Sequence, residues 1–245
     1  MPVYIGEIAA PAPGDWPWDE QRWTQKMRDI AAELRATSPP AGPFERFEIT
    51  QYGVKEKLEP GDVEVRSAAG EVFGKVTRRS LMLADIEGTM RLGGRILNIT
   101  SHGNVYEPRD VIVDGKKVVK QKPVAEKFDP AKSLWTDVTV KAPWGSGSKM
   151  PLVPFRRLAI NPYLNPDLHY RRVYIKQLDG MQLPTGERHN GVCIAGDTGG
   201  MRKTHCDLFV GREDRHITIP SVGQGGATMC EVQIMETSST ARGKR

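Results

Sequence analysis

The chain has 245 residues and a formal net charge of +5, with 35 basic against 30 acidic side chains. The basic excess is small and carries no interleaved aromatic residues, which argues against a nucleic-acid-binding protein. No apolar run is long enough to span a membrane. The 25 glycines and 18 prolines favour a turn-rich, mainly β protein over a helical bundle.

An amphipathic helix is the first predicted element. Within residues 15–36, Trp23, Met27, Ile30 and Leu34 recur at the spacing of one helix face, and the segment TSPPAGP then ends the pattern. We expect this helix to dock on the core or on a partner subunit. The preceding MPVYIGEIAAPAPGDW has no basic stretch followed by a long apolar one, so we expect no secretory signal.

Short strands are predicted from residue 44 onward. FERFEITQYGV alternates apolar and polar residues, and VEVRSAAGEVFGKVT adds two short strands around a turn. RRSLMLADIEGTMRLGG fits either a short helix or a buried strand. In RDVIVDGKKVVKQ, the pair Asp114-Gly115 predicts a tight hairpin turn. Strand-like segments continue to ATMCEVQIM, so we expect a closed or sandwich-like β structure.

Three cysteines, Cys193, Cys206 and Cys230, give an odd count without a CxxC pair. This is not a disulfide framework. Cys193 and Cys206 lie on successive predicted strands and could face each other, which leaves a disulfide between them open. Buried free thiols are the favoured interpretation.

The segment GVCIAGDTGGMRKTHCDLFVG, residues 191–211, places two aspartates between apolar strands. Asp197 follows one strand and precedes two glycines, which allow a ligand to approach the backbone closely. Asp207 lies on the next strand. Desolvation and a second carboxylate both raise the pKa of a carboxyl group, so this pattern predicts an acid that stays protonated near neutral pH. A plain Asx-turn is the alternative.

These residues resemble the end of the 3D domain, named for three aspartates, which closes the lytic transglycosylases of the membrane-bound type A family and several cell-wall remodelling proteins. FEITQYG, GKVTRRSLMLADIEGTMRLGG and LAINPYLNPDLHYRRVYI resemble earlier segments of that domain. The residues that fit its final motif are Asp197, Thr198, Gly199, Gly200, Lys203, Asp207, Phe209 and Gly211.

The resemblance implies a mainly β fold, a double-psi β-barrel with an inserted β region and an N-terminal helix. On this basis we expect residues 1–43 to form a helical arm and residues 44–235 to form the barrel. The insertion is expected near residues 100–135. Residues 236–245 are expected to be a flexible basic tail.

The resemblance also implies cleavage of the β-1,4 bond between the amino sugars of peptidoglycan, without water and without a metal or organic cofactor. One aspartate would protonate the glycosidic oxygen and then accept the proton of the C6 hydroxyl that attacks the anomeric carbon, giving a 1,6-anhydro product. We carry the acid/base role to Asp197, with Asp207 as the neighbour that tunes its pKa or holds it.

The remaining site residues would contact the glycan. Asn161 stands where the family has the first of its three aspartates, so that position keeps hydrogen bonding but loses a charge. The connection between Asp197 and Asp207 is also about one residue shorter than usual. The residues expected to line the sugar site are Thr50, Tyr52, Glu87, Asn161, Thr198, Gly199 and Lys203.

Three other classes of site fit the sequence less well. An aspartic protease needs two Asp-Thr-Gly motifs sharing one proton, so this chain would have to act as a homodimer. No Gly-x-Ser-x-Gly motif supports a nucleophilic triad. A metal site lacks ligand pairs with zinc-finger spacing; its candidates would be His189, Cys193, His205, Cys206 and Asp207.

The main rival is a barrel without catalysis, which would bind the cell wall or form part of a larger assembly. The Trp-rich helix, the lack of a signal and Asn161 favour it. An enzyme carried by a phage particle or an injection device would need no signal, so we expect a virion or device setting, or delivery to the periplasm. The expected partners are peptidoglycan strands and, through the helix, other virion or device subunits.

Overall fold

The computed structural model describes residues 20, 23, 25–113, 116–137, 151–212, 216–222 and 227–235. The chain divides into two compact units. The first contains residues 1–52, 152–211 and 215–245, and the second contains residues 53–151 and 212–214. The insertion expected near residues 100–135 lies within the second unit.

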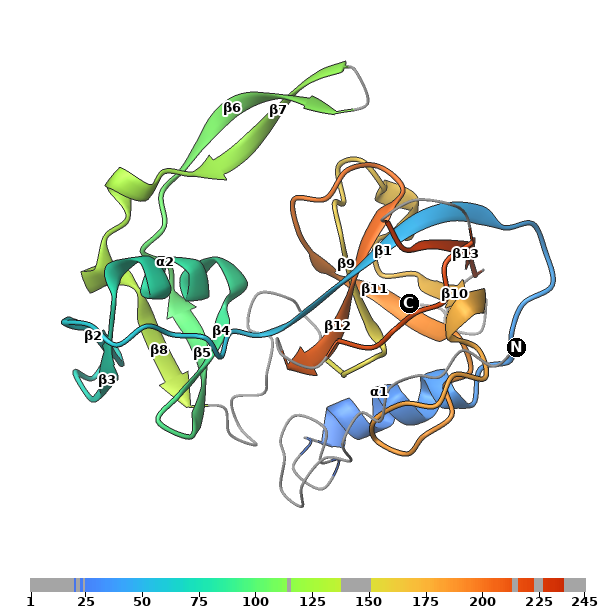
Figure 1. Ribbon diagram of the computed structural model, residues 1–245, viewed down its shortest axis with the longest axis horizontal. Helices are drawn as coiled ribbons and strands as arrows, with labels where there is room; N and C mark the ends of the chain where they lie inside the picture. Colours follow the sequence, from blue (N-terminus) through green and yellow to red (C-terminus); the bar gives the residue numbers. More distant parts are fainter. Residues whose placement is uncertain are drawn as a thin grey trace, which may run out of the picture. The chain divides into compact units, whose positions relative to one another are not determined.

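The first unit is a closed barrel of six strands in the order β1-β12-β9-β11-β10-β13 (Figure 1). Strand β9 runs parallel to β11 and antiparallel to β12. Strand β13 closes the barrel through antiparallel pairs with β1 and β10. The strands are β1 (Glu45–Val54), β9 (Arg157–Ile160), β10 (Arg172–Ile175), β11 (Val192–Thr198), β12 (His205–Arg212) and β13 (Met229–Ile234).

The barrel encloses an apolar core. Its strands contribute alternate residues, as expected where one face of each strand is buried. The prediction of a mainly β fold with a closed barrel is therefore confirmed. The core includes Phe47, Ile49, Leu158, Ile160, Val173, Ile175, Cys193, Ala195, Cys206, Leu208, Val210, Cys230 and Val232.

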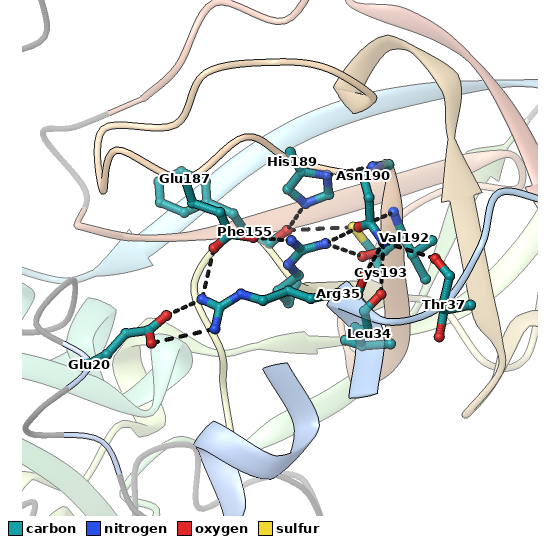
Figure 2. A network of polar contacts seen from close by, with 12 residues as sticks. Glu20, Leu34, Arg35, Thr37, Phe155, Glu187, His189, Asn190, Val192 and Cys193 are labelled. Carbon is teal, nitrogen blue, oxygen red and sulfur yellow. Dashed lines mark hydrogen bonds and ion pairs between the residues drawn. The ribbon is translucent and has the colours of Figure 1, made fainter. Parts of the chain in front are cut away.

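The amphipathic helix expected within residues 15–36 is present as α1 (Gln25–Arg35), which buries Met27, Ile30 and Leu34. Trp23 is also buried but precedes the helix. The helix lies against β11. The last carbonyls of a helix have no partner within it. Here the Asn190 side chain donates to the carbonyls of Leu34, Arg35 and Thr37, and so caps the C-terminus of α1 (Figure 2).

An ionic network fixes the same helix end (Figure 2). Glu187 lies between Arg35, at 2.8 Å, and Arg156. Arg156 is buried and also donates to Asn190 and to the Val192 carbonyl. Because a buried guanidinium needs both a counter-ion and hydrogen-bond acceptors, these contacts make the arm an integral part of the first unit.

The second unit contains a five-stranded sheet in the order β3-β2-β8-β5-β4. The undecided segment after residue 77 forms a helix, α2 (Arg78–Glu87), which Thr77 caps and which ends at the left-handed Gly88. The strands are β2 (Val63–Arg66), β3 (Val72–Val76), β4 (Thr89–Leu92), β5 (Arg95–Ser101) and β8 (Leu134–Asp137).

The predicted hairpin is also present, as β6 (Tyr106–Val113) paired with β7 (Lys116–Pro123). Its turn residues, Asp114 and Gly115, lie outside the described residues. Short 3₁₀ turns occupy Ala125–Lys127, Pro130–Lys132, Pro166–Leu168 and Lys176–Leu178. Over the described part of the chain, no helix is long and apolar enough to cross a membrane.

Candidate functional site

The candidate site lies on the barrel face that points away from the apolar core. On β1, Phe47 and Ile49 enter the core, so the intervening even-numbered residues project to the opposite face. Glu48, Thr50 and Tyr52 thus form a row along one edge of the site. All three are partly buried, as expected for a polar surface covered by its neighbours.

Strand β12 repeats this alternation. Cys206 and Leu208 are core residues, so His205 and Asp207 project to the same face as the polar row of β1. Strand β12 is the direct neighbour of β1 in the barrel. The contact between Thr50 Oγ1 and His205 Nε2, at 2.7 Å, shows that the two rows meet.

Asp197 reaches this face because β11 is irregular. Cys193 and Ala195 enter the core, and strict alternation would send Asp197 the same way. The register against β9 shifts between Ala195 and Asp197, which brings Asp197 opposite Ala159. The extra residue is Gly196, the residue type that bulges often use. The glycine before the aspartate therefore turns the carboxylate out of the core.

The two aspartates flank one small residue. Ala159 on β9 is the register partner of Asp197 on β11 and of Asp207 on β12. Because β9 lies between β11 and β12, the backbones of Asp197 and Asp207 are two strand spacings apart, about 10 Å. The alanine side chain between them is too short to fill that gap, so the sheet holds both carboxyl groups over one small patch of backbone.

The surroundings of Asp207 raise the pKa of its carboxyl group. Burial raises the pKa of Asp207 to about 6; a hydrogen bond with Thr50 opposes the rise, and the charge of Asp197 adds to it. Its Oδ1 atom is buried and has no hydrogen-bond partner. These conditions leave a sizeable fraction of Asp207 protonated in weakly acidic solution.

Asp197 has a different environment. Its Oδ2 accepts a hydrogen bond from the Tyr52 hydroxyl at 2.6 Å, and its Oδ1 accepts one from the Thr198 backbone N–H at 2.8 Å. Burial and the charge of Asp197 raise the pKa of Tyr52, so its hydroxyl remains a donor. Its ring packs on Phe209 with centroids 5.1 Å apart.

The two aspartates differ in their surroundings. The expected acid was Asp197, with Asp207 as its tuning neighbour. In the structure, burial raises the pKa of Asp207 to about 6, while Tyr52 and the Thr198 N–H donate hydrogen bonds to Asp197. The alternation of apolar and polar residues does not distinguish these environments.

Arg157 is a site residue that sequence reasoning missed. It is fully buried on β9, two residues before Ala159 and on the same face. Burial lowers its pKa, whereas the charges of Tyr52, Asp197 and Tyr170 oppose that change. The signal in the sequence was an arginine within the otherwise apolar strand RLAI, because such a residue needs an anionic neighbour.

Asn161 positions the loop that follows Asp197. Its Oδ1 accepts from the backbone N–H groups of Tyr163, at 3.1 Å, and Leu164, and its Nδ2 donates to the Met201 carbonyl at 3.0 Å. Asn165 holds the same loop by accepting from the Thr204 N–H. All of these contacts are made by an amide without charge.

The remaining predicted residues are distributed more widely. Thr198 and Gly199 are exposed at the end of β11, and the Gly199 N–H donates to the Ile160 carbonyl at 2.8 Å. Lys203 is exposed in the loop before β12. Glu87 ends α2 in the second unit. Asp197 and Asp207, called the acid pair below, have contacts with Thr50, Tyr52 and Thr198. Of the four residues just named, only Thr198 is among these contacts.

The ligands considered for a metal site do not assemble. No group of three or more His, Cys, Asp or Glu side chains in the described part of the chain could hold a metal ion. Cys193, Cys206 and Cys230 are free and buried, so the open disulfide between the first two is absent. His189 is buried beside Arg156, with a pKa lowered to about 3, and contacts the Phe155 carbonyl (Figure 2).

Comparison with known proteins finds similarity in structure only. No protein-family model and no curated protein matches the sequence. Solved structures that match include Escherichia coli MltA with bound chitohexaose, at 11% identity and a TM-score of 0.40 over 78% of this chain and 72% of that chain. An apo form of an MltA variant matches at 14% identity and a TM-score of 0.39, over 79% and 72%. The lytic transglycosylase LtgG of Burkholderia pseudomallei matches at 13% and 0.37, over 77% and 71%.

Proposed function

We propose that this protein cleaves the β-1,4 glycosidic bond between the amino sugars of peptidoglycan by transglycosylation, with Asp207 as the acid and base. The observation that carries the proposal is a desolvated carboxyl group with a pKa raised to about 6, beside a second carboxyl group across Ala159. The Asp-Thr-Gly-Gly motif and its resemblance to the 3D domain support the same chemistry.

In the proposed reaction, protonated Asp207 donates its proton to the glycosidic oxygen as the bond to the anomeric carbon breaks. The C6 hydroxyl of the same sugar then attacks that carbon and gives its proton to the Asp207 carboxylate. The products are a free sugar end and a 1,6-anhydro end, and Asp207 returns to its starting state. One carboxyl group suffices because the nucleophile is tethered to the substrate.

Asp197 has a separate part in this proposal. Its negative charge helps to keep the proton on Asp207. It also stabilises the positive charge that develops at the anomeric carbon as the bond breaks. Tyr52 and the Thr198 N–H hold Asp197 in place, and Arg157 supplies a buried positive charge on the same face.

The test is incubation of the purified protein with peptidoglycan, followed by mass spectrometry of the soluble fragments. We expect 1,6-anhydro fragments from the wild-type protein and a loss of about 1,000-fold in rate for Asp207→Asn. We also expect the rate to fall about tenfold per pH unit above pH 6, because the protonated acid is depleted there.

A matched control is available within the same barrel. Tyr174 donates to Asp179 at 2.8 Å, as Tyr52 donates to Asp197, but this second pair belongs to β10 and the 3₁₀ turn that follows it. Asp179→Asn should retain activity, whereas Asp197→Asn should lose it. Reducing sugar ends in place of anhydro ends would indicate hydrolysis, and no soluble fragments would indicate a binding or structural barrel; either result contradicts the proposal.

A further inference from the structure

The acid of the proposed site is connected to an imidazole by a single hydroxyl group. Thr50 Oγ1 lies 2.7 Å from His205 Nε2 and also forms a hydrogen bond with the Asp207 carboxyl group. A threonine hydroxyl has one proton to donate and two lone pairs that accept. Thr50 can therefore accept a hydrogen bond from one of these groups while it donates to the other.

The strand geometry makes this bridge a built feature of the barrel. His205 and Asp207 are two residues apart on β12 and share one face. Thr50 comes from the adjacent strand β1, whose neighbouring residues Phe47 and Ile49 are anchored in the core. The hydroxyl is thereby held between two titratable groups that could not contact each other along their own strand.

The chain of contacts continues beyond the imidazole. His205 Nδ1 lies 3.7 Å from Glu48 Oε2, and the same carboxylate oxygen forms an ion pair with Arg202. Glu48 and His205 are both largely covered, with side-chain exposures of 14% and 17%. Since a nearby carboxylate stabilises a protonated imidazole, Glu48 makes His205 a suitable proton acceptor.

We propose that Thr50 relays a proton between Asp207 and His205, so that His205 holds a proton in reserve for the acid. This inference rests on the proposed function, in which Asp207 must be protonated when the glycan covers it. His205 acts through Asp207 and touches no substrate in this scheme, so it is a positioning residue that sets the protonation state of the acid.

The proton transfer is balanced at every atom. In one state, the Asp207 carboxylic acid donates to Thr50, which donates to His205 Nε2, while the Nδ1–H of the neutral imidazole faces Glu48. The Asp207 proton passes to Thr50 Oγ1 as the threonine proton passes to Nε2. The second state then has an Asp207 carboxylate, an intact threonine hydroxyl and a His205 imidazolium.

Other charged groups act on the two ends of the hydrogen-bonded path from Asp207 through Thr50 to His205. Asp197 acts on Asp207 from β11, and Tyr52 and Arg157 face Asp197 from β1 and β9. Glu48 and Arg202 face His205 from β1 and from the preceding loop. A pH titration of the wild-type protein therefore reports a coupled set of groups, which is why the test relies on matched variants.

The decisive variant is Thr50→Val, because the relay and a simple hydrogen bond predict opposite effects. The Thr50 hydrogen bond lowers the pKa of Asp207, so its loss alone would leave more protonated acid at pH 7.5 and raise the rate. A lost relay instead lowers kcat at pH 7.5 by about tenfold or more, with little change at pH 5, where solvent protonates Asp207 directly.

Two further variants separate the relay from damage to the fold. Thr50→Ser keeps the hydroxyl and should restore the wild-type pH profile. His205→Gln keeps a donor toward Thr50 but holds no proton, so it should reproduce the pH-dependent loss of Thr50→Val. A Thr50→Val rate at pH 7.5 equal to or above that of the wild type, or a His205→Gln profile identical to the wild type, would overturn the relay.

A measurement without substrate distinguishes this failure from failure of the proposed function. The His205 imidazole is titrated by NMR in the wild-type protein, in Asp207→Asn, and in both backgrounds with Thr50→Val. The relay predicts that Asp207→Asn shifts the His205 midpoint, and that Thr50→Val removes most of this shift. An unchanged shift in the Thr50→Val background contradicts the relay, whether or not the protein cleaves peptidoglycan.

Discussion

Glu187 and Asp207 are both partly buried carboxyl groups of the same barrel, yet their pKa values move in opposite directions. Burial works to raise both. At Glu187, hydrogen bonds and charges from Arg35 and Arg156 overcome burial and lower the pKa. At Asp207, burial prevails and the charge of Asp197 adds to it, so the pKa rises to about 6. The sign of the neighbouring charge decides the outcome.

Two consecutive arginines at the start of β9 serve the two regions: Arg156 immediately precedes the strand and Arg157 is its first residue. Both are buried, and their side chains have different neighbours. Arg156 joins the network that holds α1, where two arginines meet two glutamates (Figure 2). Arg157 lies on the side of Asp197, whose charge opposes the lowering of the arginine pKa by burial. In the first region the carboxyl group is paired with cations, whereas in the second a neighbouring carboxylate adds to the effect of burial.

The largest effect on stability is expected for Glu187→Gln. This change leaves the guanidinium of Arg156 buried without its counter-ion and should lower the free energy of unfolding at pH 7 by about 3 kcal/mol. Because the Glu187 pKa is lowered in the folded state, the loss should shrink as the pH falls below the range in which unfolded glutamate titrates. Urea denaturation from pH 7 to pH 3 measures it.

The control for that variant is activity. Glu187 takes no part in the acid pair, so the pH dependence of glycan cleavage should be unchanged wherever the protein is folded. A shifted pH profile in Glu187→Gln would show that the Glu187 network and the acid pair are coupled and would break the comparison.

Asp207→Asn should have the opposite effect on stability. The folded-state pKa of Asp207 lies above its unfolded value of 3.8, so this group stabilises the fold fully below pH 3.8 and loses that contribution as the pH rises through about 6. Removing the ionisable group should therefore raise the free energy of unfolding at pH 7 by about 2 kcal/mol, after allowance for partial exposure.

Denaturation of Asp207→Asn across pH 3 to 8 checks the sign. The gain over the wild type should appear only as the pH rises above 4. A variant that is destabilised at pH 7 would mean that the Asp207 carboxylate is stabilised by the fold, and the contrast with Glu187 would then be lost.

The smallest effect is expected for Asn190→Ala, which removes the cap of α1. The helix end would lose the hydrogen bonds to the Leu34, Arg35 and Thr37 carbonyls, at a cost of about 1 kcal/mol. Amide hydrogen exchange should show faster opening confined to α1 and the start of β11. Uniformly faster exchange over the barrel would indicate that the arm and the barrel unfold together.

Regular patterns in the sequence were enough to predict the scaffold. The helical stripe ending at Leu34, the alternation in FERFEITQYGV and the hairpin from Tyr106 to Pro123 are each set by local periodicity, and each is present. The sequence also predicts that Asp197 and Asp207 lie near the adjoining ends of two successive strand segments, and they lie in β11 and β12.

The chemistry of the site depended on features without a periodic signal. The register shift at Gly196 turns Asp197 away from the core, against the alternation that the sequence suggests. Strand β9 separates β11 from β12, so Ala159 rather than a hairpin sets the spacing of the acid pair. The raised pKa of Asp207 and the contacts of Thr50 arise from strands that are distant in the sequence, and local patterns carry no information on them.

The most direct test of the account is the protonation of Asp207 itself. Carbon-13 NMR of the side-chain carboxyl groups, recorded from pH 2 to 9 for the wild type and for Asp207→Asn, identifies its titration by the resonance that the variant lacks. We expect a midpoint near pH 6 for that resonance. A midpoint at or below 3.8, the value for an unperturbed aspartate, would contradict the assignment of Asp207 as the acid of this site.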